Sequence, residues 1–205
     1  MLKIRRLPVG QLQTNCYLVI GGEEALIIDP GDDADYIMRI LQDEEVKPTK
    51  IIATHGHYDH ILAAGELKLA YQIPFLMHNK DEFLLKRMGS SAAHFSKISA
   101  DPPPKIDKYL KEEDTLVISH QPLFISATPG HTPGSISLYS KEASVIFVGD
   151  VIFAGGGVGR TDFAYSSLSD LKKSIKKLLK LPPNTIVYSG HGDETTIGNW
   201  RNFNR

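Results

Sequence analysis

The sequence predicts an α+β fold with two similar β-rich halves, and three observations support this prediction. Short apolar runs alternate with glycine turns and with amphipathic segments of helical length. Segments 50–57 and 185–192 resemble each other, because each has the pattern of a strand that ends in a Gly/His turn. Segments 26–29 and 147–150 also resemble each other, and each ends in an aspartate. We therefore expect two facing halves, with functional side chains from both at one edge.

The composition is that of an ordinary globular protein, with 205 residues, 41% hydrophobic and 23% charged, and we expect one domain over 1–205. The formal net charge of -1 gives no electrostatic reason to expect nucleic acid or a membrane as partner. No apolar run approaches the roughly 18 residues that a membrane span needs. The single cysteine, Cys16, excludes an internal disulfide and fits a reducing compartment, so we expect a cytoplasmic protein.

The first half should begin with antiparallel strands, because residues 2–28 alternate short apolar runs with turn residues such as Gly21-Gly22. The run 25–28 ends in Asp29, whose carboxylate is either a turn former or a partner that supports nearby metal ligands. The other elements expected here are a helix at 35–42, a strand at 49–53 and a helix at 62–70.

A strand-helix unit is predicted for 73–88, with the strand at 74–77 and Gly89 as the glycine that ends the helix. Segment 89–105 is rich in small and polar residues, and we expect a surface loop there, with a lid over the site as one hypothesis. The elements expected after it are strands at 115–119, 123–127, 136–139, 145–148 and 185–188, and a helix at 168–181.

The stretch Thr54-His55-Gly56-His57-Tyr58-Asp59-His60 joins the predicted strand at 49–53 to the helix after it. Residues two apart share a face of a strand, so the side chains of His55 and His57 converge if the backbone stays extended. Asp59 and His60 then belong to the turn and point at a neighbouring place, so that one loop offers ligands for two metals. The alternative is a polar loop in which Asp59 caps the helix and the histidines are solvated.

Three more candidate ligands lie on turns or strand ends farther along the chain, namely His131, Asp150 and His191. Together with the histidine loop they make seven potential ligands: His55, His57, Asp59, His60, His131, Asp150 and His191. No thiolate is among them, since Cys16 lies in an apolar strand and is better explained as core. The remaining histidines match no ligand motif, although His94 in segment 89–105 could contact a substrate: His78, His94 and His120.

These motifs resemble the metallo-β-lactamase superfamily, in which a His-x-His-x-Asp-His loop is followed by a turn histidine, a strand-end aspartate and a late histidine. Thr-Pro-Gly-His-Thr-Pro-Gly, Gly-Arg-Thr-Asp-Phe and Gly-His-Gly-Asp-Glu-Thr-Thr-Ile-Gly look most like its glyoxalase II-like (hydroxyacylglutathione hydrolase-like) branch. The resemblance runs from about Asn15 to Gly198 and implies a four-layer αββα sandwich.

The resemblance also implies two divalent metal ions, most simply zinc, with iron or manganese as alternatives because the donors are all nitrogen and oxygen. Asp29 would orient the histidine loop. Arg160 resembles a glutathione anchor that could pair with a substrate carboxylate, and the alternative is a surface arginine that ends a turn. The implied ligands are His55, His57 and His131 for metal one, and Asp59, His60 and His191 for metal two, with Asp150 bridging.

Two metals about 3.5 to 4 Å apart can share a hydroxide that acts as nucleophile. A thiol with a pKa of about 8.5 can leave without a protein acid, and the ligand motifs contain no uncommitted acid. We therefore expect a dinuclear hydrolase of a small thioester, S-acylglutathione or a related acyl thiol, with Asp59 and Asp150 as catalytic residues. True lactamase activity ranks low on the same leaving-group argument.

Two other functions are compatible with the motifs. A mononuclear iron persulfide dioxygenase uses this fold, but it needs only two histidines and one aspartate, whereas the second site here is complete. The other is a redox or binding module that uses the metals without water chemistry. Full-length glyoxalase II enzymes add a C-terminal helical domain, and this sequence ends seven residues after Gly198, so much of the glutathione recognition is expected to differ.

Overall fold

The computed structural model describes residues 2–204, so Met1 and Arg205, the ends of the expected unit 1–205, lie outside the described residues. The described strands form two six-stranded sheets, and each sheet follows the order of the sequence. The first contains β1 (Lys3–Val9), β2 (Thr14–Gly21), β3 (Glu24–Ile28), β4 (Lys47–Ile52), β5 (Phe75–Met77) and β6 (Lys108–Tyr109). The second contains β7 (Thr115–Ile118), β8 (Gln121–Ala127), β9 (Ile136–Ser140), β10 (Val145–Gly149), β11 (Ile186–Ser189) and β12 (Thr195–Thr196).

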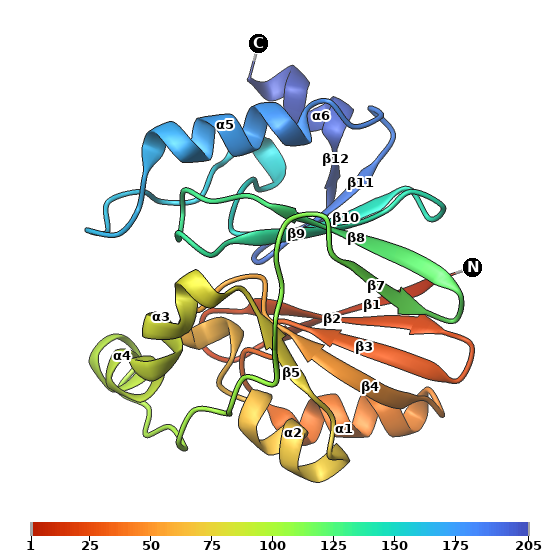
Figure 1. Cartoon of the computed structure of the whole chain (residues 1–205), viewed down its shortest axis with the longest axis vertical. Helices are drawn as coiled ribbons and strands as arrows, with labels where there is room; N and C mark the ends of the chain where they lie inside the picture. Colours follow the sequence, from red (N-terminus) through yellow and green to blue (C-terminus); the bar gives the residue numbers. More distant parts are fainter. Residues whose placement is uncertain (1, 205) are drawn as a thin grey trace.

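Helices cover the outer face of each sheet (Figure 1). Helices α1 (Ala34–Asp43) and α2 (Ala64–Tyr71) lie on the first sheet, and α5 (Leu168–Leu178) and α6 (Ile197–Phe203) lie on the second. The short helices α3 (Glu82–Lys86) and α4 (Met88–Phe95) lie at one end of the sandwich. The structure thus confirms the αββα sandwich that the motifs implied.

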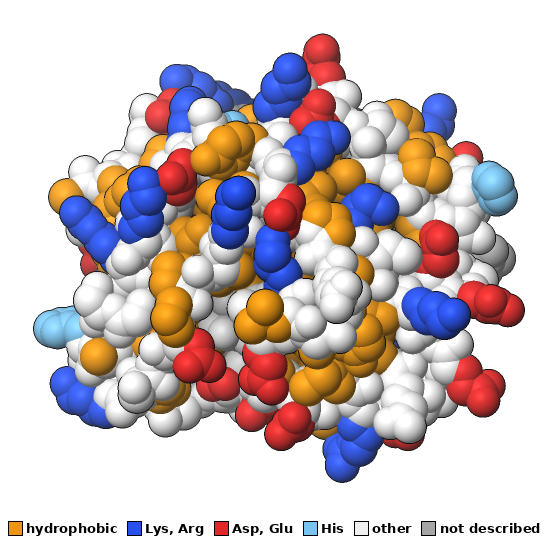
Figure 2. All heavy atoms as spheres, turned by 60° about the horizontal axis from the view of Figure 1, so that its bottom comes forward, with side chains coloured by type: hydrophobic (Ala, Val, Ile, Leu, Met, Phe, Trp, Pro, Cys, Tyr) orange, Lys and Arg blue, Asp and Glu red, His pale blue; other side chains and the backbone are white. Residues whose placement is uncertain are grey.

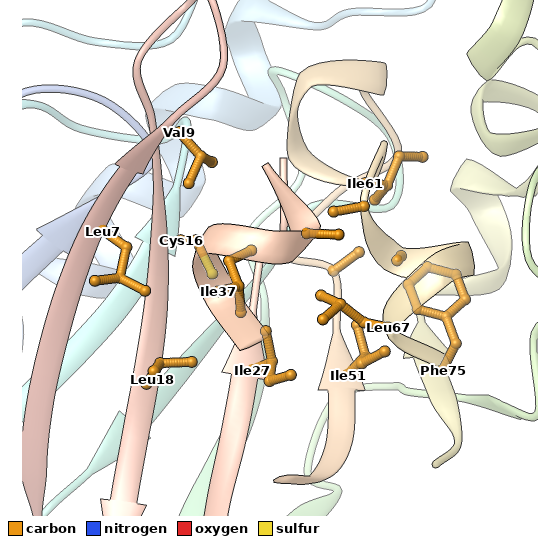
Figure 3. Close-up of a cluster of buried hydrophobic side chains, with 14 of the residues drawn as sticks. Leu7, Val9, Cys16, Leu18, Ile27, Ile37, Ile51, Ile61, Leu67 and Phe75 are labelled. Atoms are coloured by element: carbon orange, nitrogen blue, oxygen red, sulfur yellow. The ribbon is translucent and has the colours of Figure 1, made fainter. Parts of the chain in front are cut away.

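Three apolar layers hold the four structural layers together. Figure 3 shows the first, between the helices and the first sheet, where Ile37 and Leu67 pack on side chains such as Ile51 and Cys16. The second lies between the two sheets, and the third lies under α5 and α6 around Trp200. Burying a side chain such as Leu67 contributes roughly 1.5–3 kcal/mol, so these layers supply much of the stability. Cys16 is fully buried, as expected for a core residue.

A parallel β-α-β unit recurs in the two halves, which agrees with the expectation of two similar β-rich halves. In the first half β3 pairs with β4 in parallel, and α1 connects them. In the second half β10 pairs with β11 in parallel, and α5 connects them. The carboxyl ends of parallel strands meet at the same edge of a sheet, which brings the loops after β3, β4, β10 and β11 to that edge.

The expected helix end at Gly89 is wrong. The chain forms a 3₁₀ turn at Asn79–Asp81, then α3 and α4, and Gly89 lies inside α4. Met88 and Ala92 are buried, and this i, i+4 pair anchors α4 on the core strongly enough to outweigh the roughly 1 kcal/mol that a glycine costs a helix. Segment 89–105, which was expected to be a loop, is therefore helical as far as Phe95. It has no helix or strand from residue 96 to residue 105.

The surface carries charges of both signs. Figure 2 brings forward the lower end of the molecule in Figure 1, where α1 and α2 lie, and the basic and acidic side chains are intermixed there. This mixture agrees with the formal net charge of -1. Among residues 2–204, no helix has the length and apolar character that crossing a bilayer requires.

Candidate metal centre

The histidine loop follows β4 and passes through a narrow space at the edge of the sandwich. The Gly56 N–H donates to Asp81 Oδ2 over 2.9 Å, and a Cβ at Gly56 would collide with the backbone of Asp81 and the side chain of Leu84. Only glycine fits so close to a neighbouring backbone. A 3₁₀ helix, η1 (Tyr58–His60), then turns the chain so that Asp59 and His60 face the same region as His55.

The structure brings three predicted histidines together in a first group. His55 Nε2 lies 3.1 Å from His57 Nδ1, and His131 Nε2 lies 2.9 Å from the same atom. Nitrogen ligands of one tetrahedral zinc ion, each 2.0–2.1 Å from it, stand about 3.3 Å apart. The spacing of these nitrogens therefore suits one shared cation.

The other predicted ligands form a second group beside the first. Asp59 Oδ2 lies 3.6 Å from His60 Nε2 and 3.4 Å from His191 Nε2. Asp150 lies between the groups, because its Oδ1 is 3.6 Å from His60 Nε2 and its Oδ2 is 3.6 Å from His131 Nε2. A carboxylate in this place can contact cations in both groups.

Hydrogen bonds on the outer side fix three of these imidazole rings. His131 Nδ1 lies 2.8 Å from the Arg160 carbonyl oxygen, and His191 Nδ1 lies 3.1 Å from the Leu12 carbonyl oxygen. His60 Nδ1 lies 3.0 Å from Asp29 Oδ2. Carbonyl and carboxylate oxygens only accept, so each Nδ1 carries a hydrogen, and in the neutral ring Nε2 is free to bind a cation.

Asp29 supports the histidine loop through hydrogen bonds. Its two oxygens accept hydrogen bonds of 2.6 Å from the Thr54 N–H and the Thr54 hydroxyl. The hydroxyl oxygen in turn accepts from His55 Nδ1 over 3.2 Å, which leaves His55 Nε2 unprotonated. Asp29 also has a φ of 51°, so it is both a turn residue and a support for His55 and His60.

Two buried polar atoms at the centre have no hydrogen-bond partner among the described residues, namely His60 Nε2 and Asp150 Oδ1. A buried nitrogen or oxygen without a partner costs about 1–3 kcal/mol. A cation between them would remove that cost. The donor set is imidazole and carboxylate without thiolate, which suits zinc, iron and manganese. These residues therefore fit one or two divalent cations.

The two groups differ in their electrostatics. Burial, with a smaller contribution from His131, lowers the pKa of His57 to about 3, and burial lowers the pKa of His55 well below its ordinary value. Burial alone would also lower the pKa of His60, but the carboxylates of Asp59, Asp29 and Asp150 together raise it to about 10. The first group thus favours neutral imidazoles, and the second concentrates negative charge.

A cavity of about 390 Å³ opens in front of both groups. Its volume suits a small ligand. Arg160 lies at the cavity, as the sequence suggested, and two side chains of α4, Ser91 and Phe95, also line it. The described walls are otherwise mainly apolar: Leu12, Tyr58, Leu84, Phe163 and Tyr165.

Arg160 is already engaged by a neighbour. Its Nε and Nη2 donate to the two oxygens of Asp162 over 2.7 and 2.6 Å, and its guanidinium lies 4.5 Å from the centre of the Phe163 ring. The edge that was expected to hold a substrate carboxylate is therefore paired within the chain. The guanidinium N–H groups that do not face Asp162 remain available to donate to a ligand.

The histidines without a ligand motif lie apart from the two groups. His94 is exposed on α4 and is not among the residues that line the cavity. His78 accepts a hydrogen bond from the Lys80 N–H over 3.1 Å, and His120 occupies a turn with φ of 67° between β7 and β8. His94, which the sequence suggested as a substrate contact, thus does not line this cavity, and none of the three histidines belongs to the two ligand groups.

A family model for the metallo-beta-lactamase superfamily matches residues 9–191. This chain belongs to the metallo-beta-lactamase superfamily. Hydroxyacylglutathione hydrolase GloC of Haemophilus influenzae is 36% identical to it over 99% of the chain and 97% of the relative. Two solved superfamily structures are also similar. The B3 metallo-beta-lactamase BLEG-1 has a TM-score of 0.91 at 35% identity, covering 98% of this chain and 97% of that one. A di-iron-bound form of TTHA1623 has a TM-score of 0.87 at 34% identity, covering 95% of this chain and 96% of that one.

Three residues that contact the metallo-beta-lactamase motifs were missed by the sequence interpretation. The Thr14 hydroxyl donates to Asp59 Oδ2 over 3.1 Å. The Asp81 carboxylate joins the histidine loop to the turn that carries His131, and Tyr165 Oη lies 2.8 Å from His57 Nε2. Each is far from its partner in the sequence and has no motif of its own. The only signal for Tyr165 in the sequence is its place two residues after Phe163, which ends the Gly-Arg-Thr-Asp-Phe motif.

Proposed function

We propose that the chain is a dinuclear metal-dependent hydrolase of a small thioester, an S-acylglutathione or a related acyl thiol. The observation that carries this proposal is the set of five imidazoles from both halves. Each has one ring nitrogen in an outward hydrogen bond and the other turned toward the other candidate ligands of its group. A loop that only caps a helix needs one polar side chain. Five convergent rings with fixed orientations are typical of a metal site.

The proposed ligands are those that the motifs implied. Cations held there would supply water activated at neutral pH and would stabilise charge on a carbonyl oxygen. Zinc is proposed first, and iron or manganese are the alternatives. The ligand sets are His55, His57 and His131 for one cation, and Asp59, His60 and His191 for the other, with Asp150 shared.

Asp59 and Asp150 are the proposed catalytic carboxylates. Burial would raise the pKa of Asp59, but His60 and His191 hold it below its usual range, so that Asp59 stays ionised. The Thr14 hydroxyl donates to Asp59 Oδ2 and fixes the orientation of the carboxylate. An ionised and oriented carboxylate can accept a hydrogen bond from an attacking water and direct it.

Three observations support a thioester as substrate. Similarity to a hydroxyacylglutathione hydrolase extends over almost the whole length of both chains. The ligand motifs also contain no uncommitted acid, and a thiolate leaves more easily without one than an amine does. The apolar walls and the Arg160 guanidinium at the cavity suit a small acyl group on an anionic thiol. We also propose a cytoplasmic location, because the lone cysteine fits a reducing compartment.

The test measures metal content and hydrolysis of S-lactoylglutathione for the purified protein, for Asp150→Ala and for Asp43→Ala. Asp43 is an exposed aspartate at the end of α1 and serves as the matched control. We expect about two metal ions per chain. Asp150→Ala should lower kcat/KM by at least about 100-fold, since supporting residues alone account for 10- to 100-fold. Asp43→Ala should behave like the unchanged protein.

Other outcomes would favour other functions. Faster hydrolysis of a cephalosporin than of any thioester would replace the proposal with lactam hydrolysis. One iron per chain, no hydrolysis, and oxygen consumption with glutathione persulfide would replace it with the dioxygenase. Metal binding without turnover of any of these compounds would favour a redox or binding role.

A further inference from the structure

Tyr165 is held firmly at the wall of the cavity. It is half-buried, and its ring stacks on Phe163 with centroids 5.2 Å apart and planes inclined by 9°. It also packs edge-to-face with Phe83, with centroids 5.4 Å apart. Such aromatic contacts fix the direction of the ring. The Tyr165 hydroxyl therefore has a defined place, 2.8 Å from His57 Nε2.

The second ring nitrogen of His57 determines which group donates in that hydrogen bond. His57 Nδ1 lies 2.9 Å from His131 Nε2 and 3.1 Å from His55 Nε2, so Nδ1 is the atom that would bind a cation. A cation binds the unprotonated nitrogen, which leaves the ring hydrogen on Nε2. His57 Nε2–H then donates to Tyr165 Oη, and the tyrosine hydrogen is free for another acceptor.

A bound ligand is the natural acceptor for that hydrogen. Within residues 2–204, Tyr165 Oη has no hydrogen-bond partner other than His57 Nε2, and Tyr165 lines the cavity. The His57 ring separates Tyr165 Oη from the centre of the first group. The hydroxyl is therefore one imidazole ring away from the candidate ligand nitrogens, so that a substrate carbonyl held at the first group would leave its neighbouring carbon, and not the carbonyl itself, within reach of Tyr165.

We propose that Tyr165 is a specificity-determining residue whose hydroxyl donates a hydrogen bond to an oxygen on the α carbon of the acyl group. This inference rests on the proposed thioester hydrolysis, and it selects 2-hydroxyacyl thioesters within that class. A site that hydrogen-bonds a substrate hydroxyl discriminates against the analogue that lacks it, because the protein group then stays unpaired.

The test compares two substrates that differ only in the α-hydroxyl, S-lactoylglutathione and S-propionylglutathione, at saturating metal. For the unchanged protein and for Tyr165→Phe, the quantity measured is the ratio of kcat/KM between the two substrates. Intrinsic reactivity cancels in the comparison of ratios. We expect the preference for the lactoyl compound to fall about tenfold in Tyr165→Phe, the usual effect of one hydrogen bond.

A matched control and a second readout separate specificity from metal binding. Tyr109 donates its hydroxyl to Glu82 over 2.7 Å on the exposed surface, so Tyr109→Phe should leave the ratio unchanged. Tyr165→Phe also removes the acceptor of His57 Nε2–H. We therefore expect one cation to bind about tenfold more weakly in a chelator competition, as is typical for loss of such a partner.

Equal slowing of both substrates by Tyr165→Phe, with an unchanged ratio, would overturn the proposal and leave Tyr165 as a partner of His57 only. If the unchanged protein hydrolyses neither thioester, the proposed function fails separately. The same comparison is then made with lactate and propionate, by the change in visible absorption of the cobalt-loaded protein. If Tyr165→Phe weakens the binding of lactate and of propionate equally, the inference is overturned. If it weakens the binding of lactate alone, the inference is supported.

Discussion

Asp29 and Asp150 occupy equivalent places in the two halves, yet only Asp150 faces both groups of ligands. Each follows the first strand of a parallel β-α-β unit. The Asp29 oxygens accept from the Thr54 N–H, the Thr54 hydroxyl and His60 Nδ1. Asp150 Oδ1 has no hydrogen-bond partner in the described part of the chain. The same position in the fold thus gives a supporting carboxylate in one half and an open one in the other.

The residue that precedes the histidine on the neighbouring strand explains this difference. Thr54 precedes His55 after β4, and its two donors occupy the Asp29 carboxylate. Gly190 precedes His191 after β11, and a Cβ there would collide with Asp150 Oδ1. Glycine brings no side-chain donor and leaves the oxygen open. The comparison teaches that the donors beside a strand-end aspartate, and not its place in the fold, determine its role.

The largest effect that tests this comparison is on the stability of the metal-free protein. Asp29→Asn should lower the free energy of unfolding by about 3 kcal/mol, because the amide cannot accept all the hydrogen bonds that Asp29 accepts. Asp150→Asn should lower it by less than Asp29→Asn does, since no hydrogen bond to Oδ1 is lost and only the attraction between the carboxylate and His60 disappears. Urea unfolding in the presence of a chelator measures both. Equal losses would contradict the difference in roles.

A third buried carboxylate, Asp81, connects the two halves. It accepts from the Gly56 N–H in the first half, and from the Gly134 N–H and the Thr132 hydroxyl, both over 2.6 Å, in the second. Asp81→Asn should lower the free energy of unfolding by about 2 kcal/mol and weaken the binding of one cation about tenfold. Chelator competition measures the affinities, with the exposed Asp101→Asn as control. Equal weakening of both cations would contradict a role confined to the first group.

The pH dependence of the metal-free protein should separate the two groups. His57 has a folded pKa of about 3, below its ordinary value of about 6.5, so its contribution to stability is present above pH 6.5 and is lost as the pH falls. His60 has a folded pKa of about 10, so its contribution is present below pH 6.5 and is lost as the pH rises toward 10.

Melting temperatures in chelator should therefore be highest near pH 6.5, to the extent that these two residues dominate the dependence. His60→Gln should flatten the alkaline side alone, and His57→Gln the acid side alone. An unchanged alkaline side in His60→Gln would contradict the assignment. These melts test the difference in charge between the two groups without any substrate.

The smallest expected effect is at the rim of the cavity. Asp162→Ala releases the edge of the Arg160 guanidinium that Asp162 now occupies, on the exposed surface where solvent screens an ion pair and its loss costs little stability. If Arg160 holds a carboxylate of the thiol part, kcat/KM for S-lactoylglutathione should rise about threefold. The matching measurement uses a lactoyl thioester of an uncharged thiol, which should not change. A fall in kcat/KM for both thioesters would show that the Arg160–Asp162 pair supports the conformation of its own segment.

The sequence determined most of the β-strands and the residues around which the centre is built. Apolar runs between glycine turns are local signals, and they placed β3, β4, β10 and β11 within a few residues. The echo between the halves predicted that the ligand loops share one edge. The continuation of α4 through Gly89 was missed, since burial of Met88 and Ala92 depends on the rest of the fold.

The partners of the ligands were decided by the tertiary structure alone. Asp81, Tyr165 and Thr14 lie far along the chain from the side chains that they contact, and isolated polar residues carry no local pattern. The backbone carbonyls that hold His131 and His191 have no sequence signature of any kind. The candidate ligands were visible in the sequence because the pattern that marks them depends on residue type and spacing. Ligand orientation depends on hydrogen bonds between distant segments, which exist only once the two sheets have packed together.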